Sequence, residues 1–119
     1  MRICFDLDGT ICTAVSDYET AVPFQRVVSL MQALSEQGHT IVIQTARGMG
    51  SSNQNPGAAR AKYAALTFRQ LEEWGVPYNE IYFGKPGADY YFDDKGFNAV
   101  DMYAKIERII QAGEGHGRI

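Results

Sequence analysis

The chain lacks the features that define membrane, secreted and nucleic-acid-binding proteins. No apolar run approaches the roughly 20 residues of a membrane-spanning helix, and the first residues do not form a signal peptide. Two cysteines, Cys4 and Cys12, are too few for a disulfide framework and indicate reduced thiols. A net charge of −3 provides no basic excess for nucleic-acid phosphates. We therefore expect a soluble, cytoplasmic protein that binds neither membrane nor nucleic acid.

The composition is that of one small folded domain. The 119 residues are 45% hydrophobic and 21% charged, and the length falls below the roughly 150 residues expected per domain. The last helical pattern stops near Gly113. We therefore predict one domain over residues 1–113 and a frayed C-terminal tail over 114–119.

Short apolar segments alternate with segments of helical periodicity. Apolar and β-branched runs predict strands at residues 2–6, 40–45, 81–83 and 90–92. Helical spacing predicts a first helix over 23–37, a second that ends at Gly75 and a third that ends near Gly113. Four residues are expected to line one face of the second helix: Ala61, Ala65, Phe68 and Leu71. The alternation predicts an α/β fold, a single Rossmann-like three-layer α/β/α domain with a mostly parallel sheet.

Polar residues follow every predicted strand, and in a parallel sheet those strand ends share one edge. Four carboxylates at one edge repel each other unless a cation lies between them. Oxygen ligands without clusters of His or Cys favour a hard ion, so we expect Mg²⁺, although Mn²⁺ accepts similar ligands. A metal and a lysine can hold a phosphoryl group while one carboxylate attacks it. The candidates are Asp6, Asp8, Thr45, Lys85, Asp93 and Asp94.

These residues carry a resemblance to a known superfamily. The segment from Phe5 to Thr10, with the sequence FDLDGT, resembles the first motif of the haloacid-dehalogenase-like (HAD) phosphatases. Thr45, Lys85 and the acids at 93–94 resemble the second, third and fourth motifs, in the same order. The segments TARGM after the second strand and GKP after the third are similar to small phosphatases encoded with capsule or surface-sugar biosynthesis. The resemblance covers residues 1 to about 112.

The resemblance implies a role for each motif residue. Asp6 would be the nucleophile that forms an aspartyl-phosphate, and Asp8 would protonate the leaving alcohol and then activate water. Thr45 would hydrogen-bond a phosphoryl oxygen, and Lys85 would offset negative charge on Asp6 and on the phosphoryl group.

The resemblance also implies the metal ligands. They would be the carboxylates of Asp6, Asp93 and Asp94 together with the main-chain carbonyl of Asp8. Ala46 and Arg47 follow Thr45 at the border of the site and are candidate substrate-binding residues.

The intervals between the motifs leave no room for a cap domain, so the chain resembles the capless members and favours hydrolysis over phosphomutase chemistry. We expect a Mg²⁺-dependent phosphomonoester hydrolase for a small phosphorylated metabolite, a sugar or polyol phosphate. A capless site is open, so we also expect a homo-oligomer in which a neighbouring subunit covers it. The segment from Gly9 to Val22 corresponds to the mobile flap of the superfamily, and the role of the Gly48 to Gly57 loop is left open.

Other interpretations are weighed beside this one. An open site also admits a phosphoprotein or a nucleic-acid end. A receiver-type phospho-acceptor domain also combines acids, a Thr and a Lys on a parallel sheet. In such a domain the acid pair lies on the first strand and the phospho-acceptor on a middle strand, whereas here the order is reversed. The Asp-x-Asp-Gly segment could belong to a calcium loop, but the third acid and the final Glu of such a loop are missing. Thr45 alone would be a loop cap and Lys85 alone a surface lysine, so the prediction depends on the whole ordered set.

Overall fold

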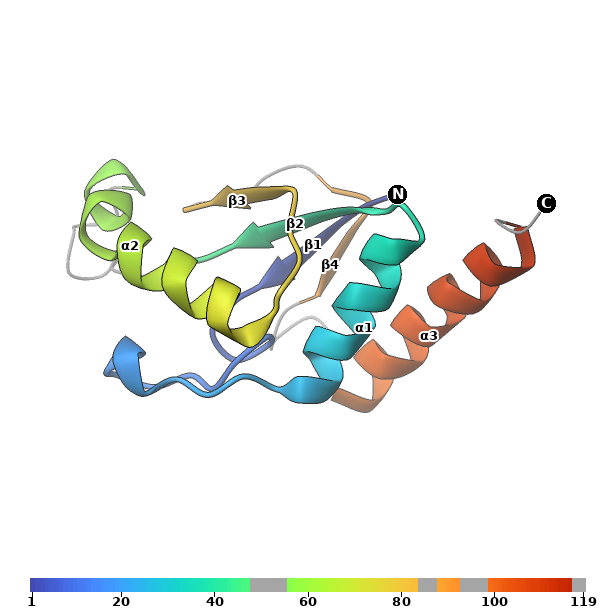
Figure 1. Cartoon of the computed structure of the whole chain (residues 1–119), viewed down its shortest axis with the longest axis horizontal. Coiled ribbons are helices and arrows are strands. Elements are labelled where there is room, and N and C mark those ends of the chain that lie inside the picture. Colours follow the sequence, from blue (N-terminus) through green and yellow to red (C-terminus); the bar gives the residue numbers. More distant parts are fainter. Residues whose placement is uncertain (48–55, 84–87, 93–98, 117–119) are drawn as a thin grey trace.

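A computed structural model of the chain describes residues 1–47, 56–83, 88–92 and 99–116 (Figure 1). The structure alternates strands and helices, as the sequence predicts. Its elements, in chain order, are β1 (Arg2–Asp6), the short 3₁₀ helix η1 (Tyr18–Thr20), α1 (Gln25–Glu36), β2 (Thr40–Gln44), α2 (Pro56–Trp74), β3 (Glu80–Tyr82), β4 (Tyr90–Phe92) and α3 (Ala99–His116).

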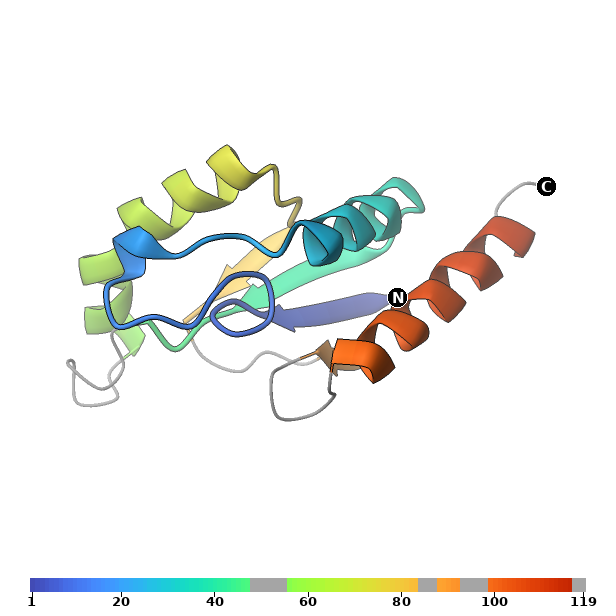
Figure 2. The same cartoon turned by 90° about the horizontal axis from the view of Figure 1, so that it is seen from below.

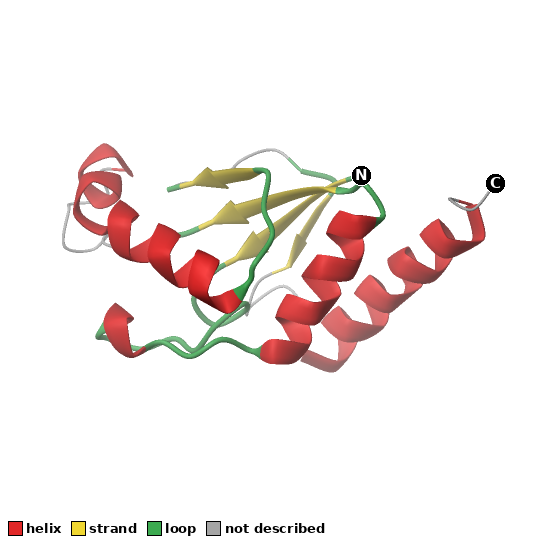
Figure 3. Ribbon diagram, viewed as in Figure 1, coloured by secondary structure: helices red, strands yellow, loops and turns green. Residues whose placement is uncertain are grey.

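The four strands form one parallel sheet in the order β3-β2-β1-β4 (Figure 3). β1 lies in the interior of the sheet, where Phe5 is in register with Ile43 of β2 and with Phe92 of β4. The predicted parallel sheet and the Rossmann-like α/β fold are confirmed. Because all strands run the same way, the segments that follow them lie along one edge.

One hydrophobic cluster joins the sheet to all three helices. Alternating strand residues such as Ile3 and Phe5 point to one face, and they pack with buried residues of α1, α2 and α3. Cys4 and Val42 alternate to the opposite face, where they are also buried but lie outside this cluster. Leu71 of α2, for example, is buried in the same cluster as the apolar stripe of α1.

The helical layering differs from the prediction. α1 and α3 lie side by side (Figures 1 and 2), and Arg26 of α1 forms an ion pair with Glu107 of α3. Within the described residues the helices therefore form one layer on one face, rather than the two layers of an α/β/α sandwich. The shared hydrophobic cluster is the reason, because buried residues of α1, α2 and α3 all belong to the same cluster as Ile3 and Phe5.

The first helix is shorter than the predicted span of 23–37. Pro23 and Phe24 stay with the preceding loop, because Pro23 forms a β-bridge with Cys12 and the Phe24 N–H donates to the Ile11 carbonyl. The helix ends at Glu36, one residue before the predicted end, and Gly38 just beyond it has a φ of +85°, a left-handed conformation that glycine adopts without strain.

The buried face of α2 was predicted wrongly in part. Ala61 and Ala65 are exposed and Phe68 is half-buried, whereas Leu71 is buried as expected. Among the α2 side chains that the structure describes, the buried ones are instead Thr67, Gln70 and Leu71, and the two polar ones have partners described below.

The last helix extends beyond the predicted boundary at Gly113 and ends at His116. Of the 114–119 segment, only 117–119 thus lies outside the described residues. None of the described helices combines the length and apolar character that a bilayer crossing requires.

Candidate active site

Two of the predicted site segments lie next to each other at the carboxyl edge of the sheet. Asp6 ends β1 opposite Gln44, which ends β2. The strands are held together past their ends, because the Leu7 N–H donates to the Gln44 carbonyl at 3.1 Å. Thr45 follows, with its N–H donating to the Tyr82 carbonyl at the end of β3 at 2.9 Å. The sheet thus places the Asp6–Asp8 segment beside Thr45, as the sequence predicts.

A tight turn follows β1 and presents Asp8. The Leu7 carbonyl accepts from the N–H groups of Ile11 and Cys12 at 2.9 and 3.3 Å. Gly9 has a φ of +88°, a left-handed conformation that is strained for residues with a side chain. This conformation explains why a glycine follows Asp8. The turn therefore fixes the backbone on both sides of Asp8.

The predicted flap, Gly9 to Val22, includes this turn, and its remaining residues, 13–22, leave the sheet and return to α1 (Figure 2). Residues 13–22 are called the flap segment below. Its two arms are joined by the Thr13 N–H, which donates to the Val22 carbonyl at 2.9 Å. At its far end lies η1, capped by the Asp17 carboxylate, which accepts from the Glu19 N–H. Tyr18 begins this short helix, so the flap has internal structure of its own.

The Asp8 carboxylate is bound by Arg47. The guanidinium Nη2 lies 3.0 Å from Oδ1, and Nε lies 3.2 Å from Oδ1 and 3.1 Å from Oδ2. Arg47 is only 1% exposed, although it is one of the largest side chains of the chain, whereas the Asp8 side chain is 21% exposed. The pair is therefore a partly buried, charge-assisted contact at the edge of the site.

Two residues of α2 complete the surroundings of Arg47, and the sequence analysis missed both. Arg47 Nη1 donates to the Thr67 hydroxyl at 3.3 Å and to the Gln70 side-chain carbonyl at 2.5 Å. A sequence signal existed, since Thr67 and Gln70 are three positions apart and share a helix face with Leu71. Polar residues within an apolar helical stripe indicate a buried polar partner.

Thr45 is buried and also caps the loop that follows it. Its Oγ1 accepts from the Arg47 N–H at 3.1 Å, which is the structural role weighed above. A hydroxyl that accepts one bond keeps its own proton for donation, so this cap is compatible with a bond to a phosphoryl oxygen. Ala46, a candidate for substrate contact, follows Thr45 directly and is exposed.

The described part of the donor set consists of oxygen ligands. Asp6 is half-buried at the end of β1, whereas Lys85, Asp93 and Asp94 lie outside the described residues. Burial, followed by the Asp8 charge, raises the pKa of the Cys12 thiol to about 12. Within the described residues no three ligating acids, histidines or cysteines come together, so the predicted metal set depends on Asp93 and Asp94.

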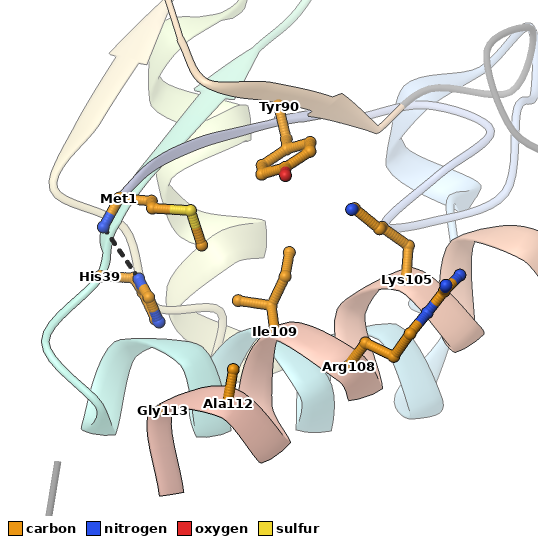
Figure 4. A pocket seen from close by; sticks show the side chains of 8 residues that line it. All are labelled: Met1, His39, Tyr90, Lys105, Arg108, Ile109, Ala112 and Gly113. Atoms are coloured by element: carbon orange, nitrogen blue, oxygen red, sulfur yellow. Dashed lines mark hydrogen bonds between the residues drawn. The ribbon is translucent and has the colours of Figure 1, made fainter. Parts of the chain in front are cut away.

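A separate cavity of about 370 Å³ lies at the amino edge of the sheet, away from Asp6 and Asp8 (Figure 4). Tyr90 of β4 covers it, with Lys105 of α3 placed 4.6 Å from the centre of its ring. His39 lies on the other side and is hydrogen-bonded to the Met1 nitrogen. Burial, together with the neighbouring amino group, lowers the pKa of His39. His39 therefore lies at the amino edge of the sheet, and not at the carboxyl edge where Asp6 and Asp8 lie.

The fold and the carboxyl-edge residues define a small Rossmann-like α/β domain with an acidic motif after its first strand. Among solved structures, the chain matches a crystal structure of an MCSG target from Vibrio cholerae with a TM-score of 0.72 and 30% identity. The match covers 93% of this chain and 97% of the other. The chain therefore belongs to the same family as this Vibrio cholerae protein, whose name states no activity. No protein-family model and no curated protein matches the sequence.

Two other solved structures are similar at low identity. A chain of the Pnkp1/Rnl/Hen1 RNA repair complex matches with a TM-score of 0.51 and 15% identity, over 92% of this chain and 31% of that one. This likeness shows a shared fold alone. A D,D-heptose bisphosphate phosphatase from B. bronchiseptica, complexed with magnesium and phosphate, matches with a TM-score of 0.49 and 15% identity, over 96% of this chain and 63% of that one. The second likeness is too weak to support a conclusion.

Proposed function

We propose that the chain is a HAD-type phosphatase that hydrolyses phosphomonoesters through an aspartyl-phosphate on Asp6. The observation that carries the proposal is the joint position of the first two motifs. Asp6 and Asp8 follow β1, Thr45 follows the adjacent β2, and the strands are in register up to Asp6 and Gln44. In this proposal one edge of the sheet carries the nucleophile Asp6, the proton-transfer group Asp8 and the phosphoryl-binding hydroxyl of Thr45.

The reaction has two displacements at phosphorus. In the first, an Asp6 carboxylate oxygen forms a bond to phosphorus, the ester P–O bond breaks, and the Asp8 carboxyl gives its proton to the departing alkoxide. In the second, the Asp8 carboxylate takes a proton from water, the water oxygen bonds to phosphorus, and the aspartyl P–O bond breaks. Inorganic phosphate leaves, and Asp6 and Asp8 regain their starting states. Thr45 orients the phosphoryl oxygens in both steps, and Lys85 offsets their charge.

We assign the metal of this site as Mg²⁺, held by Asp6, the Asp8 main-chain carbonyl, Asp93 and Asp94. The donor chemistry fits, because all of these ligands are oxygens, which hard divalent cations prefer. When bound, the ion would neutralise charge on the phosphoryl oxygens during transfer. Mn²⁺ would satisfy the same ligands.

The substrate that we propose is a small sugar or polyol phosphate, acted on in the cytoplasm. The basis is the short interval between the motifs, which leaves the site without a cap, and the similarity of the motif segments to surface-sugar phosphatases. A phosphoprotein or a nucleic-acid end is the alternative substrate class. We further propose that a second copy of the chain covers the open rim.

The test is phosphate release from a panel of sugar phosphates, polyol phosphates, nucleotides and a phosphopeptide, with Mg²⁺ or with chelator. We expect metal-dependent release by the wild type and a loss of about 10³-fold or more in Asp6→Asn, because the amide cannot form the aspartyl-phosphate. Asp101→Asn is the matched control, since Asp101 is an exposed acid on α3. An Asp6→Asn protein as active as the wild type would refute the proposal. A stably phosphorylated wild type without turnover, detected by intact mass, would favour a phospho-acceptor domain instead.

A further inference from the structure

The buried Arg47 side chain has all of its donors in use. A guanidinium has five N–H groups in a fixed plane. Nε and Nη2 donate to Asp8, and Nη1 donates to Thr67 and Gln70. The second N–H group of Nη2 donates to the Cys12 sulfur, with Nη2 and Sγ 3.9 Å apart. An arginine that bound a substrate phosphate would instead present N–H groups toward solvent, so this geometry gives Arg47 a partner other than the substrate.

The contacts divide the two oxygens of Asp8 into two kinds. Oδ1 accepts from Arg47 Nε, from Nη2 and, more weakly, from the Cys12 thiol at 3.5 Å. Within the described residues, Oδ2 accepts from Nε alone. Oδ1 is therefore the anchored oxygen, and Oδ2 is the oxygen with capacity left for a proton.

The same arginine is also linked to the flap segment. The Tyr18 ring lies with its centre 4.9 Å from the guanidinium carbon, and it meets Tyr63 of α2 edge to face at 5.0 Å. The Gln70 amide bridges the two parts: its oxygen accepts from Arg47 and its nitrogen donates to the Tyr18 carbonyl at 2.7 Å. Docking of the flap on α2 thus completes the surroundings of the arginine that holds Asp8.

We propose that Arg47 is the positioning residue of Asp8, and that docking of Tyr18 on α2 holds Arg47 in place. The flap then sets the orientation of the proton-transfer carboxylate, with Oδ1 anchored and Oδ2 presented to the leaving oxygen and to water. This inference rests on the proposed phosphatase function, and it replaces substrate contact as the role of Arg47.

The test compares two esters that differ in their need for proton donation. An alkyl phosphate requires protonation of its leaving alkoxide, whereas para-nitrophenyl phosphate releases a phenolate that needs none. General acid–base assistance contributes about 10²- to 10⁴-fold. The readout is kcat/KM, which reports the transfer of the phosphoryl group to Asp6 and not the later hydrolysis that both esters share. We expect Arg47→Ala to lower kcat/KM by about 10²-fold or more on the alkyl ester, and by a factor about ten times smaller on the nitrophenyl ester. KM changes little in either case, and added guanidinium ion restores part of the alkyl-ester activity.

The matched control is Arg26→Ala. Arg26 also pairs with an acid, Glu107, and also lies over a tyrosine ring, Tyr103 at 4.0 Å, but it lies between α1 and α3. We expect this variant to keep the wild-type ratio of the two ester rates. An Arg47→Ala protein with equal losses on both esters, or with a raised KM as the main effect, would overturn the positioning role.

The link to the flap is tested with Tyr18→Ala and Tyr18→Phe. Alanine removes the ring beneath the guanidinium, whereas phenylalanine keeps it, and both variants keep the backbone carbonyl that Gln70 contacts. We expect Tyr18→Ala to shift the ester ratio in the direction of Arg47→Ala, and by several-fold more than Tyr18→Phe. Equal ratios for the two variants would refute the link.

A measurement without turnover separates this inference from the proposed function. Side-chain NMR of arginine reports solvent exchange at Arg47 Nε–H, which we expect to be slow in the wild type and faster in Tyr18→Ala and Asp8→Asn. Unchanged exchange in both variants would overturn the linkage even in an active enzyme. A wild type that hydrolyses neither ester would refute the phosphatase function and with it the catalytic consequence, while the exchange rates would still decide whether Tyr18 holds Arg47.

Discussion

Helices α1 and α2 pack on the same face of the sheet but bury different kinds of side chain. α1 buries an apolar stripe: Val27, Val28, Met31 and Leu34. Of the described side chains on α2, the buried ones are Thr67, Gln70 and Leu71. The polar pair receives the hydrogen bonds of Arg47, which in turn binds Asp8. The first helix therefore stabilises the fold, whereas the second supports the side chains of the site.

The largest expected effect on stability comes from α1. Leu34→Ala removes a fully buried side chain and should lower the free energy of unfolding by about 2–5 kcal/mol. The turnover number of the folded fraction should stay unchanged, since Leu34 of α1 packs in the hydrophobic cluster, whereas Asp8 is bound by Arg47. Urea unfolding and phosphate release measure the two quantities. Leu30→Ala is the control, because Leu30 is only partly buried against the same cluster and should cost less. A lower turnover with unchanged stability would contradict this division.

The α2 face should respond in the opposite way. Thr67→Val keeps the volume but removes the hydroxyl that accepts from Arg47 Nη1, so we expect a stability loss of about 1 kcal/mol and a several-fold drop in kcat on alkyl phosphates. Thr40→Val at the amino end of β2 is the control, and it should leave kcat unaltered. If the α2 face were only hydrophobic core, Thr67→Val would raise stability and leave turnover as it is.

The smallest effect is expected from the ion pair of Arg2 and Glu80, whose side chains are about one-third exposed, in contrast to the buried Arg47 of the pair with Asp8. The hydrogen bond from Arg2, followed by that from Tyr82, lowers the pKa of Glu80 below its ordinary value of 4.5. Its contribution to stability is therefore present above pH 4.5 and is lost as the pH falls through the lowered pKa. Glu80→Gln should flatten this acid limb slightly, and added salt should reduce the difference. Identical acid-unfolding curves for both proteins would show that the pair contributes nothing.

Local patterns were enough to predict most of the secondary structure. The β-branched and apolar runs located β1, β2 and β4 to within a residue, because side-chain alternation and strand propensity depend on neighbours in sequence. Gly38 and Gly75 ended the first two helices as expected, since both adopt the positive φ that other residues avoid. That Asp6 and Thr45 share one edge of the sheet followed from the parallel direction of the strands, whereas the adjacency of β1 and β2 was found in the structure.

The surroundings of Arg47 could not be predicted in the same way. Arg47 meets Thr67, Gln70 and Asp8 across separations of 20, 23 and 39 residues, and no local periodicity carries such information. A polar loop residue after a strand is ordinarily solvated, so exposure and substrate contact were the natural expectation for it.

The amino-acid sequence by itself thus determined the parallel α/β fold, the carboxyl ends of the first two helices and the chain order of the motif residues, because these depend on periodicity, backbone preference and strand direction. Only the tertiary structure decided that the described helices share one face, that α2 turns polar residues inward, and that Arg47 is buried against Asp8. The physical reason is that a buried charge must find its partners among whichever side chains packing brings within reach.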